Sequence, residues 1–272
     1  MPKVSICIPA YNSAKYIGRT IESILSQTFD DFELIIVDDV SSDNTCEVIT
    51  SFKDERIRFF KNEKNQGLVG NWNVCMNYAT GEYIHYLCGD DVIYPECIAK
   101  KVKILDENDN VALVFSASHI INENDKIIFS RRYYKKDRQF NGKSFLKKSF
   151  RTKNIYGEPS NVLFRKNLIE RAGLFESSLC YSPDWEYWMR LSLYGDVSYI
   201  DDYLMSFRIS DTSETGKLLT SRKSELKADD QNFCTLVKNN PEMNITDLDV
   251  CMHKVAITLR SWAKLVFMFL KH

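Results

Sequence analysis

The sequence predicts an α/β protein built on a Rossmann-like, mixed but mostly parallel sheet with helices on both faces. Over residues 1–115, short apolar runs alternate with segments of helical periodicity, which is typical of strands joined by crossover helices. After residue 116 the alternation weakens, and from Ser221 the chain is helical and at first highly charged. We therefore expect a sheet domain over 1–215, in halves 1–115 and 116–215, and a helical C-terminal extension over 216–272.

The strands of the first half are predicted from short, mostly apolar runs, and residues 32–37 have the pattern of a strand buried on both faces. They cover residues 4–8, 32–37, 57–60, 82–87 and 111–115. Helices follow the first four, and their ends are read from residues that cap or stop helices. Those residues are Asn12 or Ser13 for the first helix, Ser41 or Ser42 for the second, Gly81 after a third over 71–79, and Pro95 at the start of the fourth.

The second half gives weaker signals for its elements. Residues 127–129 and 161–164 are predicted as edge strands, and 197–200 and 204–207 as two further short strands. Residues 184–194 are predicted as a helix, because their apolar side chains recur at helical spacing. The chain carries no internal repeat and no low-complexity linker.

Composition excludes several classes of protein. Of the 272 residues, 44% are hydrophobic and 27% charged, which is an ordinary globular balance. The formal net charge of −1 shows no basic excess, so we expect no nucleic-acid partner. No stretch approaches the roughly 20 apolar residues that span a bilayer. The eight cysteines form no CxxC pair, which argues against a zinc knuckle. With no signal-peptide pattern at the start, we expect reduced thiols and a cytoplasmic location.

Three polar clusters directly follow predicted strands. They are Pro9-Ala10-Tyr11-Asn12, Asp38-Asp39 and Gly89-Asp90-Asp91. Since ligands of parallel sheets bind outside the carboxyl ends of the strands, these clusters should line one site. A tyrosine beside a buried aspartate suits a nucleobase, and adjacent carboxylates suit Mg²⁺ or Mn²⁺. Taken singly, each cluster also fits a plainer role, because aspartates often cap helices and tyrosines often pack.

Five segments together resemble one known family. They read VSICIPAYN, SILSQTFDDFELIIVDDVSSDNT, NQG, GEYIHYLCGDD and SPDWEYWMRL. They resemble the family 2 glycosyltransferases with the GT-A fold over residues 2–210. The resemblance implies inverting transfer of a sugar from a nucleotide-diphospho-sugar, usually UDP-linked, to an acceptor hydroxyl. It also suggests a role in bacterial surface polysaccharide synthesis.

The resemblance assigns roles to individual residues. Asp39 would contact the base, Asp90 the ribose and phosphates, and Asp91 the metal, while Asp184 would be the catalytic base. The remaining donor-site residues are predicted to be Pro9, Ala10, Tyr11, Asn12, Asn73 and Gly89. The sequence departs from the family at four positions. Cys88 replaces the usual first acid, Trp72 an arginine and Pro183 a glutamate, while Ser210 stands where a histidine is common.

The acceptor side is predicted less sharply. Trp185 could stack on a sugar or pack in the core, and Glu186 flanks the base. Glu158 lies in a segment, 157–161, that could line the sugar pocket or form a simple turn. Asp184 itself begins a helical segment, so it could also act as a helix cap.

The last helix has apolar residues at alternating four- and three-residue steps, interspersed with lysines and arginine. These are Val255, Leu259, Trp262, Val266 and Phe269. Such a stripe fits docking onto the catalytic domain or a second subunit. It also fits an interfacial helix on the inner face of the cell membrane, which would suit a lipid-linked sugar acceptor.

Two other functions compete with glycosyl transfer. A catalytically inert nucleotide-sugar-binding partner is compatible with the replacements at Cys88 and Ser210. A sugar nucleotidylyltransferase would share the α/β fold, but it would normally show a first loop rich in glycine and arginine. The cluster Pro9-Ala10-Tyr11-Asn12 is not such a loop, and no GxxxxGK[ST] or GxGxxG motif is present.

Overall fold

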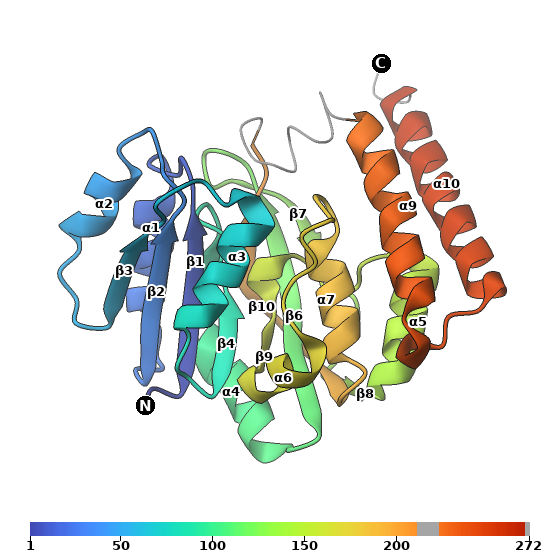
Figure 1. The fold of residues 1–272 in the computed structure, drawn as a ribbon, viewed down its shortest axis with the longest axis horizontal. Helices are drawn as coiled ribbons and strands as arrows, with labels where there is room; N and C mark the ends of the chain where they lie inside the picture. Colours follow the sequence, from blue (N-terminus) through green and yellow to red (C-terminus); the bar gives the residue numbers. More distant parts are fainter. Residues whose placement is uncertain (211–222, 270–272) are drawn as a thin grey trace.

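The computed structural model shows one large sheet flanked by helices (Figure 1). It describes residues 1–210 and 223–269, with side chains as far as residue 259. The strand order is β3-β2-β1-β4-β9-β6-β10-β5, and β7 and β8 are added beside β6 and β10. The pairs β3/β2, β2/β1, β1/β4 and β6/β10 are parallel, whereas β9 runs antiparallel to both β4 and β6. The predicted mixed, mostly parallel sheet is confirmed.

The strands have the following bounds: β1 Val4–Ala10, β2 Phe32–Asp38, β3 Ile57–Lys61, β4 Tyr83–Tyr86, β5 Val92–Ile93, β6 Val111–Ile121, β7 Ile127–Arg131, β8 Arg138–Phe140, β9 Leu163–Arg165 and β10 Asp196–Arg208. Every residue of β2 is buried, as its FELIIVD sequence predicts for a strand covered on both faces. The end of β1 pairs with the end of β2 as Ala10 opposite Asp38, so two of the predicted polar clusters leave the sheet side by side.

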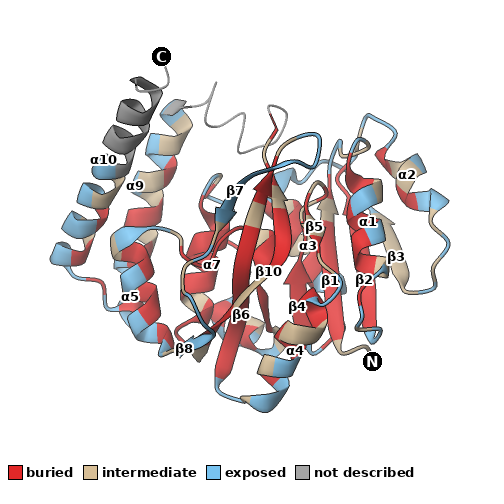
Figure 2. Cartoon of the chain, turned by 180° about the vertical axis from the view of Figure 1, so that it is seen from behind, coloured by how far each residue is buried: buried red, intermediate tan, exposed pale blue. Residues whose placement is uncertain are grey.

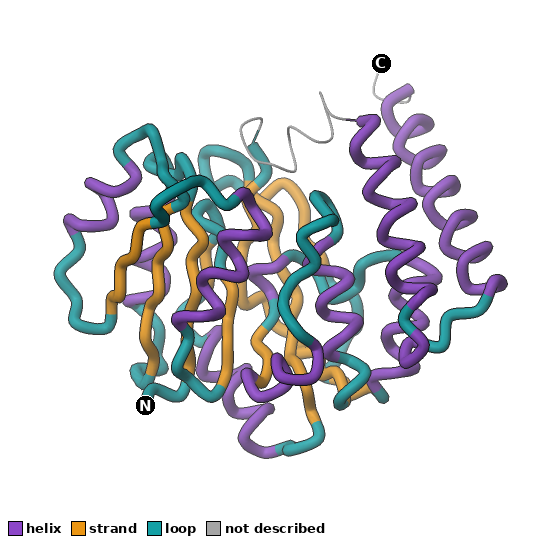
Figure 3. The backbone as a smooth tube through the Cα atoms, in the orientation of Figure 1, coloured by secondary structure: helices purple, strands orange, loops and turns teal. Residues whose placement is uncertain are grey.

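The helices form layers on the two faces of the sheet (Figures 1 and 3). Their bounds are α1 Ile17–Leu25, α2 Thr45–Ser51, α3 Gly67–Tyr78, α4 Cys97–Glu107, α5 Gly142–Thr152, α6 Ile169–Ala172, α7 Pro183–Leu191, α9 Lys223–Asn239 and α10 Asp247–Phe269. Helices α3, α6 and α7 lie on one face, and α1 and α4 on the other. Seen from behind, the strands between them are almost wholly buried (Figure 2).

Several predicted elements change in the structure. The two short strands over 197–200 and 204–207 are one bulged strand, β10, which pairs with a longer β6 than predicted. Residues 161–164 were expected at a sheet edge, but β9 lies inside the sheet between β4 and β6. Helix α5 was not predicted. The expected side-chain caps of α1 and α2 are also absent. The candidate cap residues of α1, Asn12 and Ser13, instead bond to Ser42 and Thr45 in and after the next loop.

The C-terminal helices pack against the rest of the chain. Phe233 and Val237 of α9 are fully buried in the same core cluster as Trp188 of α7. Asp249 of α10 is buried and forms an ion pair with Arg151 of α5. Figure 1 shows α9 and α10 side by side at the end of the sheet beyond α7. Within the described residues, no helix is long and apolar enough to cross a membrane. Residues 216–222 and the side chains of Trp262, Val266 and Phe269 lie outside the described part.

Candidate active site

The loops that follow β1 and β2 are bonded to each other. The Asn12 side-chain oxygen accepts from the Ser42 N–H at 2.8 Å, and the Asn12 N–H donates to the Ser41 hydroxyl at 2.9 Å. The Ser13 N–H donates to Thr45 at 2.8 Å. These bonds close because β1 and β2 are parallel neighbours whose carboxyl ends meet at one edge. The predicted first two clusters therefore form a single rim.

Asp39 ties this rim to the start of α3. Its carboxylate is buried and accepts from the Asn62 side chain at 2.7 Å and from the Gln66 and Gly67 N–H groups at 2.8 and 3.0 Å. Two of those N–H groups belong to the helix N-terminus, which favours negative charge. Oδ2 accepts only one of the three bonds and keeps acceptor capacity for a ligand N–H or hydroxyl.

Tyr11 is the prominent exposed aromatic side chain of the rim. It is 51% exposed, whereas Ala10 is buried and Pro9 is half-buried. The backbone around it is unusual, since Asn12 has φ +46° and Val40 has φ +62°. A β-branched residue in the left-handed region is strained, and such strain gathers at ligand sites. The bonds that close the rim hold the backbone in this conformation.

Gly89 lets the third cluster approach the first loop. A Cβ at Gly89 would come within 3.0 Å of the Ser13 hydroxyl and 3.2 Å of its Cβ. The glycine is therefore needed for close packing rather than for an unusual φ. It brings Asp90 and Asp91 beside the Pro9–Asn12 loop, as the sequence predicted.

Asp90 and Asp91 differ sharply in their surroundings. Asp91 is fully buried, and its Oδ1 accepts from the Arg208 N–H at 2.9 Å while Oδ2 accepts from the Ser160 hydroxyl. Burial raises the pKa of Asp91 well above its usual range, and the charge of Asp90 adds to this. Asp90 is half-buried, and in the described chain no other residue donates a hydrogen bond to its carboxylate. Burial raises the pKa of Asp90 to about 6. Asp91, the expected metal ligand, thus faces the protein interior.

Arg208 is the buried cation behind these two acids, and sequence reasoning did not single it out. Its side chain has no exposed surface and donates to the carbonyl oxygens of Asp90 and Asn122 at 2.9 and 2.8 Å. It also forms an ion pair with Asp125 at 2.5 Å and lies over the Tyr16 ring. Arg208 lies two residues before Ser210, the position where a histidine is common in the family that the sequence resembles, and this nearness is the signal in the sequence that could have marked it.

The segment between α5 and β9 joins the two sides of the site. The Ser160 hydroxyl accepts from the Cys88 N–H at 2.9 Å and donates to Asp91. A few residues earlier, the Asn154 side chain donates to the Gly157 carbonyl at 2.9 Å and to the Asp184 carboxylate at 3.2 Å. Burial raises the pKa of the Cys88 thiol, and the charges of Asp91, Asp90 and Asp184 raise it further. The three carboxylates therefore surround a common region.

Asp184 has the surroundings of a tuned base. It lies in the first turn of α7, is 7% exposed, and has its pKa raised to about 7, mainly by burial. Backbone N–H groups of the helix start and the Asn154 amide oppose the shift, while the charge of Asp229 adds to it. Ser182, not Asp184, occupies the N-cap position. A buried carboxyl whose pKa is raised to about 7 is suited to proton transfer.

Asp229 of α9 holds the loop that leads into Asp184. Its carboxylate accepts from the N–H groups of Cys180, Tyr181 and Ser182, at 2.5, 3.1 and 3.1 Å, and from the Ser182 hydroxyl at 2.9 Å. No motif marked Asp229, because its partners lie 47 to 49 residues away in the chain. The C-terminal extension thus reaches the entrance of α7 directly.

We expect Asp229→Ala to lower turnover about tenfold or more, because a loosened 180–182 loop misplaces Asp184. The donor KM should change little, since the donor rim lies on other loops. Asn232→Ala is the matched control. Asn232 lies on the same helix but bonds Ser178 at the surface, so its loss should leave turnover near wild type. Equal effects of the two variants on kcat would contradict the positioning role.

Four other predicted residues have structural partners. The Asn73 side-chain nitrogen donates to the Phe175 carbonyl at 3.0 Å, and its side-chain oxygen accepts from the Phe175 N–H at 2.9 Å, so both ends of the amide are engaged within the protein. Trp185 is 8% exposed, donates to Ser149 at 2.7 Å and stacks on Phe233, so it packs in the core. Glu186 is buried and accepts twice from Arg190.

Glu158 remains beside the site. It is 8% exposed and paired with Arg131 through Oε1, whereas its buried Oε2 has no partner in the described chain. The nearby Ser160 and Asn161 side chains are fully buried and hydrogen-bonded. The segment 157–161 is therefore more than a simple turn, because it anchors Asp91 and carries Glu158.

The fold is that of the GT-A class of glycosyltransferases. Solved structures agree on the fold. One is TarS of S. aureus, residues 1–349, in complex with UDP-GlcNAc. It matches with a TM-score of 0.73 at 18% identity, and the match covers 94% of this chain and 71% of the TarS chain. Another is a mannosyltransferase from Pyrobaculum calidifontis in complex with GDP-Man and Mn²⁺. It matches with a TM-score of 0.60 at 14% identity, and the match covers 97% of this chain and 83% of that chain.

The chain belongs to glycosyl transferase family 2, whose family model matches residues 5–173. An uncharacterised glycosyltransferase of Methanocaldococcus jannaschii is 33% identical over 216 residues, which is 76% of this chain and 71% of that protein. An Escherichia coli enzyme named as a UDP-Glc:alpha-D-GlcNAc-diphosphoundecaprenol beta-1,3-glucosyltransferase is 36% identical over 121 residues, or 44% and 47% of the two chains. The protein is therefore a glycosyltransferase.

Proposed function

We propose that the protein transfers a sugar from a UDP-linked donor to a hydroxyl of a lipid-linked glycan, with inversion at the anomeric carbon. The observation that carries the proposal is Asp184, a buried carboxyl whose pKa is raised to about 7 and whose charge, like that of the half-buried Asp90, acts on the Cys88 thiol. This pairing offers a proton acceptor on one side and an acidic donor-binding edge on the other. The named activity of the Escherichia coli relative supports the substrate class.

The donor would lie along the rim at the carboxyl ends of β1 and β2. Tyr11 presents an exposed ring on which a base can stack, as aromatic side chains commonly do. Asp39 Oδ2 has acceptor capacity for a base N–H, and its carboxylate is already fixed by the start of α3. Pro9, Ala10 and Asn12 shape the loop that presents Tyr11. Gly89 permits the close packing that brings Asp90 to the diphosphate.

A divalent cation fits this site best at Asp90. Mg²⁺ and Mn²⁺ take carboxylate oxygens together with substrate phosphates, and a ligand oxygen must be approachable. Asp90 meets that condition, because it is half-buried and has no donor from another described residue on its carboxylate. Asp91 does not meet it, because its side chain has no exposed surface and its two oxygens face the Ser160 hydroxyl and the Arg208 N–H in the interior. When bound, the cation would supply charge neutralisation for the departing diphosphate.

Asp184 would act as the general base. As the acceptor oxygen attacks the anomeric carbon, its proton passes to an oxygen of the Asp184 carboxylate. The bond between that carbon and the diphosphate oxygen breaks on the opposite face, so the configuration inverts. A single carboxylate is sufficient, and no covalent nucleophile is required. Asn154 and the Asp229-bonded loop hold Asp184 in position for this transfer.

The Asp90→Asn variant tests the donor and metal assignment. We expect it to fold with little change in Tm, because no other described residue bonds to the carboxylate, and to lose Mn²⁺-dependent UDP binding by tenfold or more. Isothermal titration of UDP with and without Mn²⁺ measures this. Asp91→Asn is the matched comparison and should mainly lower Tm, because it breaks buried hydrogen bonds. The assignment would be wrong if Asp91→Asn kept its Tm and lost the effect of Mn²⁺ on UDP binding while Asp90→Asn retained that effect. The metal ligand would then be Asp91.

The rival function is an inert nucleotide-sugar-binding partner, which the loss of an acid at Cys88 would suit. Asp184 favours the enzyme, since a binding module has no need of a buried base near neutral pKa. Incubation with a panel of UDP- and GDP-sugars, a lipid-diphospho-sugar acceptor and Mn²⁺ separates the two. The enzyme transfers sugar and releases the nucleotide. Tight UDP binding with no turnover of any donor would favour the inert module.

A further inference from the structure

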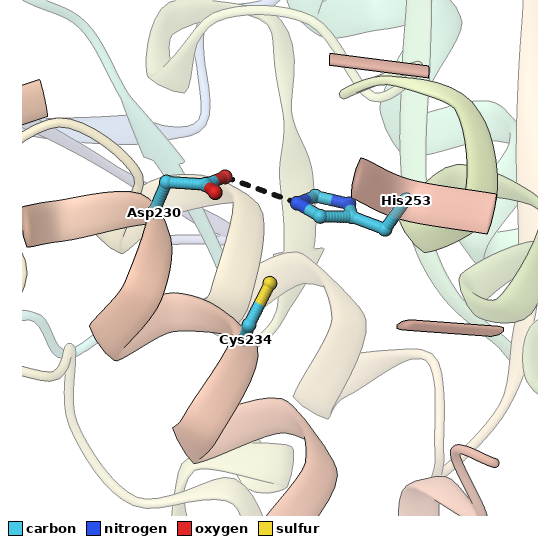
Figure 4. A group of neighbouring side chains, drawn as sticks. All are labelled: Asp230, Cys234 and His253. Carbon is cyan, nitrogen blue, oxygen red and sulfur yellow. Dashed lines mark hydrogen bonds and ion pairs between the residues drawn. The ribbon is translucent and has the colours of Figure 1, made fainter. Parts of the chain in front are cut away.

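We propose that Asp230, Cys234 and His253 form a zinc-binding site in the helical extension, separate from the donor site. Each residue offers one ligand atom, and these atoms all lie within 4.8 Å of one another. Figure 4 shows the carboxylate, the thiol and the imidazole converging on one point between the helices. None of the three has a role in the proposed transfer reaction.

The positions of the three residues in the chain explain why they converge. Asp230 and Cys234 are four residues apart on α9, so they project from the same face one turn apart. His253 comes from α10, which runs beside α9 (Figure 1). Two ligands from one helix turn and a third from the adjacent helix are a common way to build a metal site from helices.

The imidazole of His253 is held in a ligating orientation. It is fully buried, stacks on Phe150 at 4.6 Å between ring centroids, and has Nδ1 2.7 Å from the Phe150 carbonyl oxygen. A carbonyl accepts only, so Nδ1 carries the hydrogen and donates. Metal-ligating histidines are usually fixed in this way through their other ring nitrogen. Nε2 is thereby aimed at Asp230, whose Oδ1 lies 3.0 Å away.

The three ligand atoms favour zinc over the Mg²⁺ or Mn²⁺ proposed for the nucleotide-sugar site. A thiolate, an imidazole and a carboxylate match the sulfur, nitrogen and oxygen ligands that Zn²⁺ takes, whereas Mg²⁺ and Mn²⁺ prefer oxygen alone. The Asp230 side chain is 34% exposed, so solvent reaches the cluster from that side. A water molecule entering there would complete four-coordination.

The cluster needs little rearrangement to hold the ion. Tetrahedral zinc with ligand bonds of about 2.0–2.3 Å places its donor atoms roughly 3.3–3.8 Å apart. His253 Nε2 and Asp230 Oδ1 lie 3.0 Å apart and no pair of ligand atoms is more than 4.8 Å apart, so side-chain adjustments suffice. On binding, the ion replaces the hydrogen shared by His253 and Asp230 and the thiol hydrogen of Cys234. Both protons pass to solvent, and no oxidation is involved.

The site lies where a metal would fasten the extension to the rest of the chain. It links α9 to α10, and through the Phe150 carbonyl it also touches α5. The residue before Asp230 is Asp229, which holds the loop in front of Asp184. A zinc ion that fixes this turn of α9 would therefore also stiffen the support of the catalytic loop.

Cobalt substitution tests the site directly. We expect metal-free protein in the Asp90→Asn background to bind one Co²⁺ per chain with the near-ultraviolet thiolate charge-transfer band and the intense visible bands of a tetrahedral site. Added Zn²⁺ should abolish these bands and raise Tm. Cobalt bound to carboxylates alone gives no thiolate band, so residual binding near Asp91 would not imitate the result.

Matched cysteine variants identify the ligand. Cys234→Ser should lose the charge-transfer band and weaken Zn²⁺ binding at least tenfold, whereas Cys251→Ser, an exposed thiol on α10, should change neither. His253→Gln should lower the affinity similarly. If Cys234→Ser does not fold, the Zn²⁺ affinity is measured on Asp230→Asn instead, because Asp230 is the partly exposed ligand. Absence of the band in the parent protein, or its persistence in folded Cys234→Ser, would overturn the proposal.

Discussion

Replacing Asp184 with asparagine should lower kcat by about 10²–10⁴-fold, the usual contribution of a positioned general base. The amide keeps the shape of the side chain and its bond with Asn154 can persist, but it cannot accept a proton at neutral pH. The fold should be retained, because a buried carboxyl with a raised pKa gains little from its charge. Single-turnover measurement of sugar transfer checks the chemical step, and UDP titration checks that donor binding persists.

The pH dependence of the transfer rate tests the role of Asp184 as the base in a second way. The pKa of Asp184 is raised to about 7, so the base is ionised above that pH and protonated below it. The rate should therefore fall about tenfold per pH unit below pH 7 and level off above it. In Asp184→Asn this acidic limb should disappear along with most of the activity.

Glu186→Gln is the control, since Glu186 lies two residues along the same helix but accepts from Arg190. It should alter stability more than turnover. A loss of transfer in Glu186→Gln equal to that in Asp184→Asn would place the base elsewhere.

Replacing Arg208 with methionine should destabilise the protein by about 3–5 kcal/mol and lower Tm by roughly 10 °C. Arg208 has no exposed surface, and its guanidinium bonds the Asp90 and Asn122 carbonyl oxygens and Asp125. Removing the cation would leave the Asp90 carbonyl oxygen without this donor, take one partner each from Asn122 and Asp125, and remove the positive charge beside the buried Asp91. Chemical and thermal unfolding measure the change in the free energy of unfolding.

Arg19→Met provides the comparison for that loss. Arg19 pairs with the same Asp125, but its side chain is 57% exposed, so its removal should cost no more than about 1 kcal/mol. If the two variants lost equal free energy of unfolding, the burial of Arg208 would not explain its contribution to stability.

The sequence predicted where the site lies more reliably than what each residue does there. The clusters at Tyr11, Asp39 and Asp90 follow strands whose apolar runs are unambiguous, and parallel pairing brings those strand ends together. Asp184 was found through its segment SPDWEYWMRL, which also predicted its helix. The side chains of Asn73 and Trp185, which lie near these clusters in the sequence, turn toward protein partners, and for Trp185 this matches the core-packing alternative.

Local pattern therefore predicted the strands of the first half, the sheet edge at which the polar clusters lie and the helix that carries Asp184. The tertiary structure alone decided that Asp91 faces inward while Asp90 faces the site, because that division depends on Arg208, 117 residues further along the chain. It also supplied Asp229 and the Asp230–Cys234–His253 cluster, whose partners lie on other elements. The physical reason is that a side chain's role depends on which hydrogen-bond partners packing brings to it, and these contacts are remote in sequence.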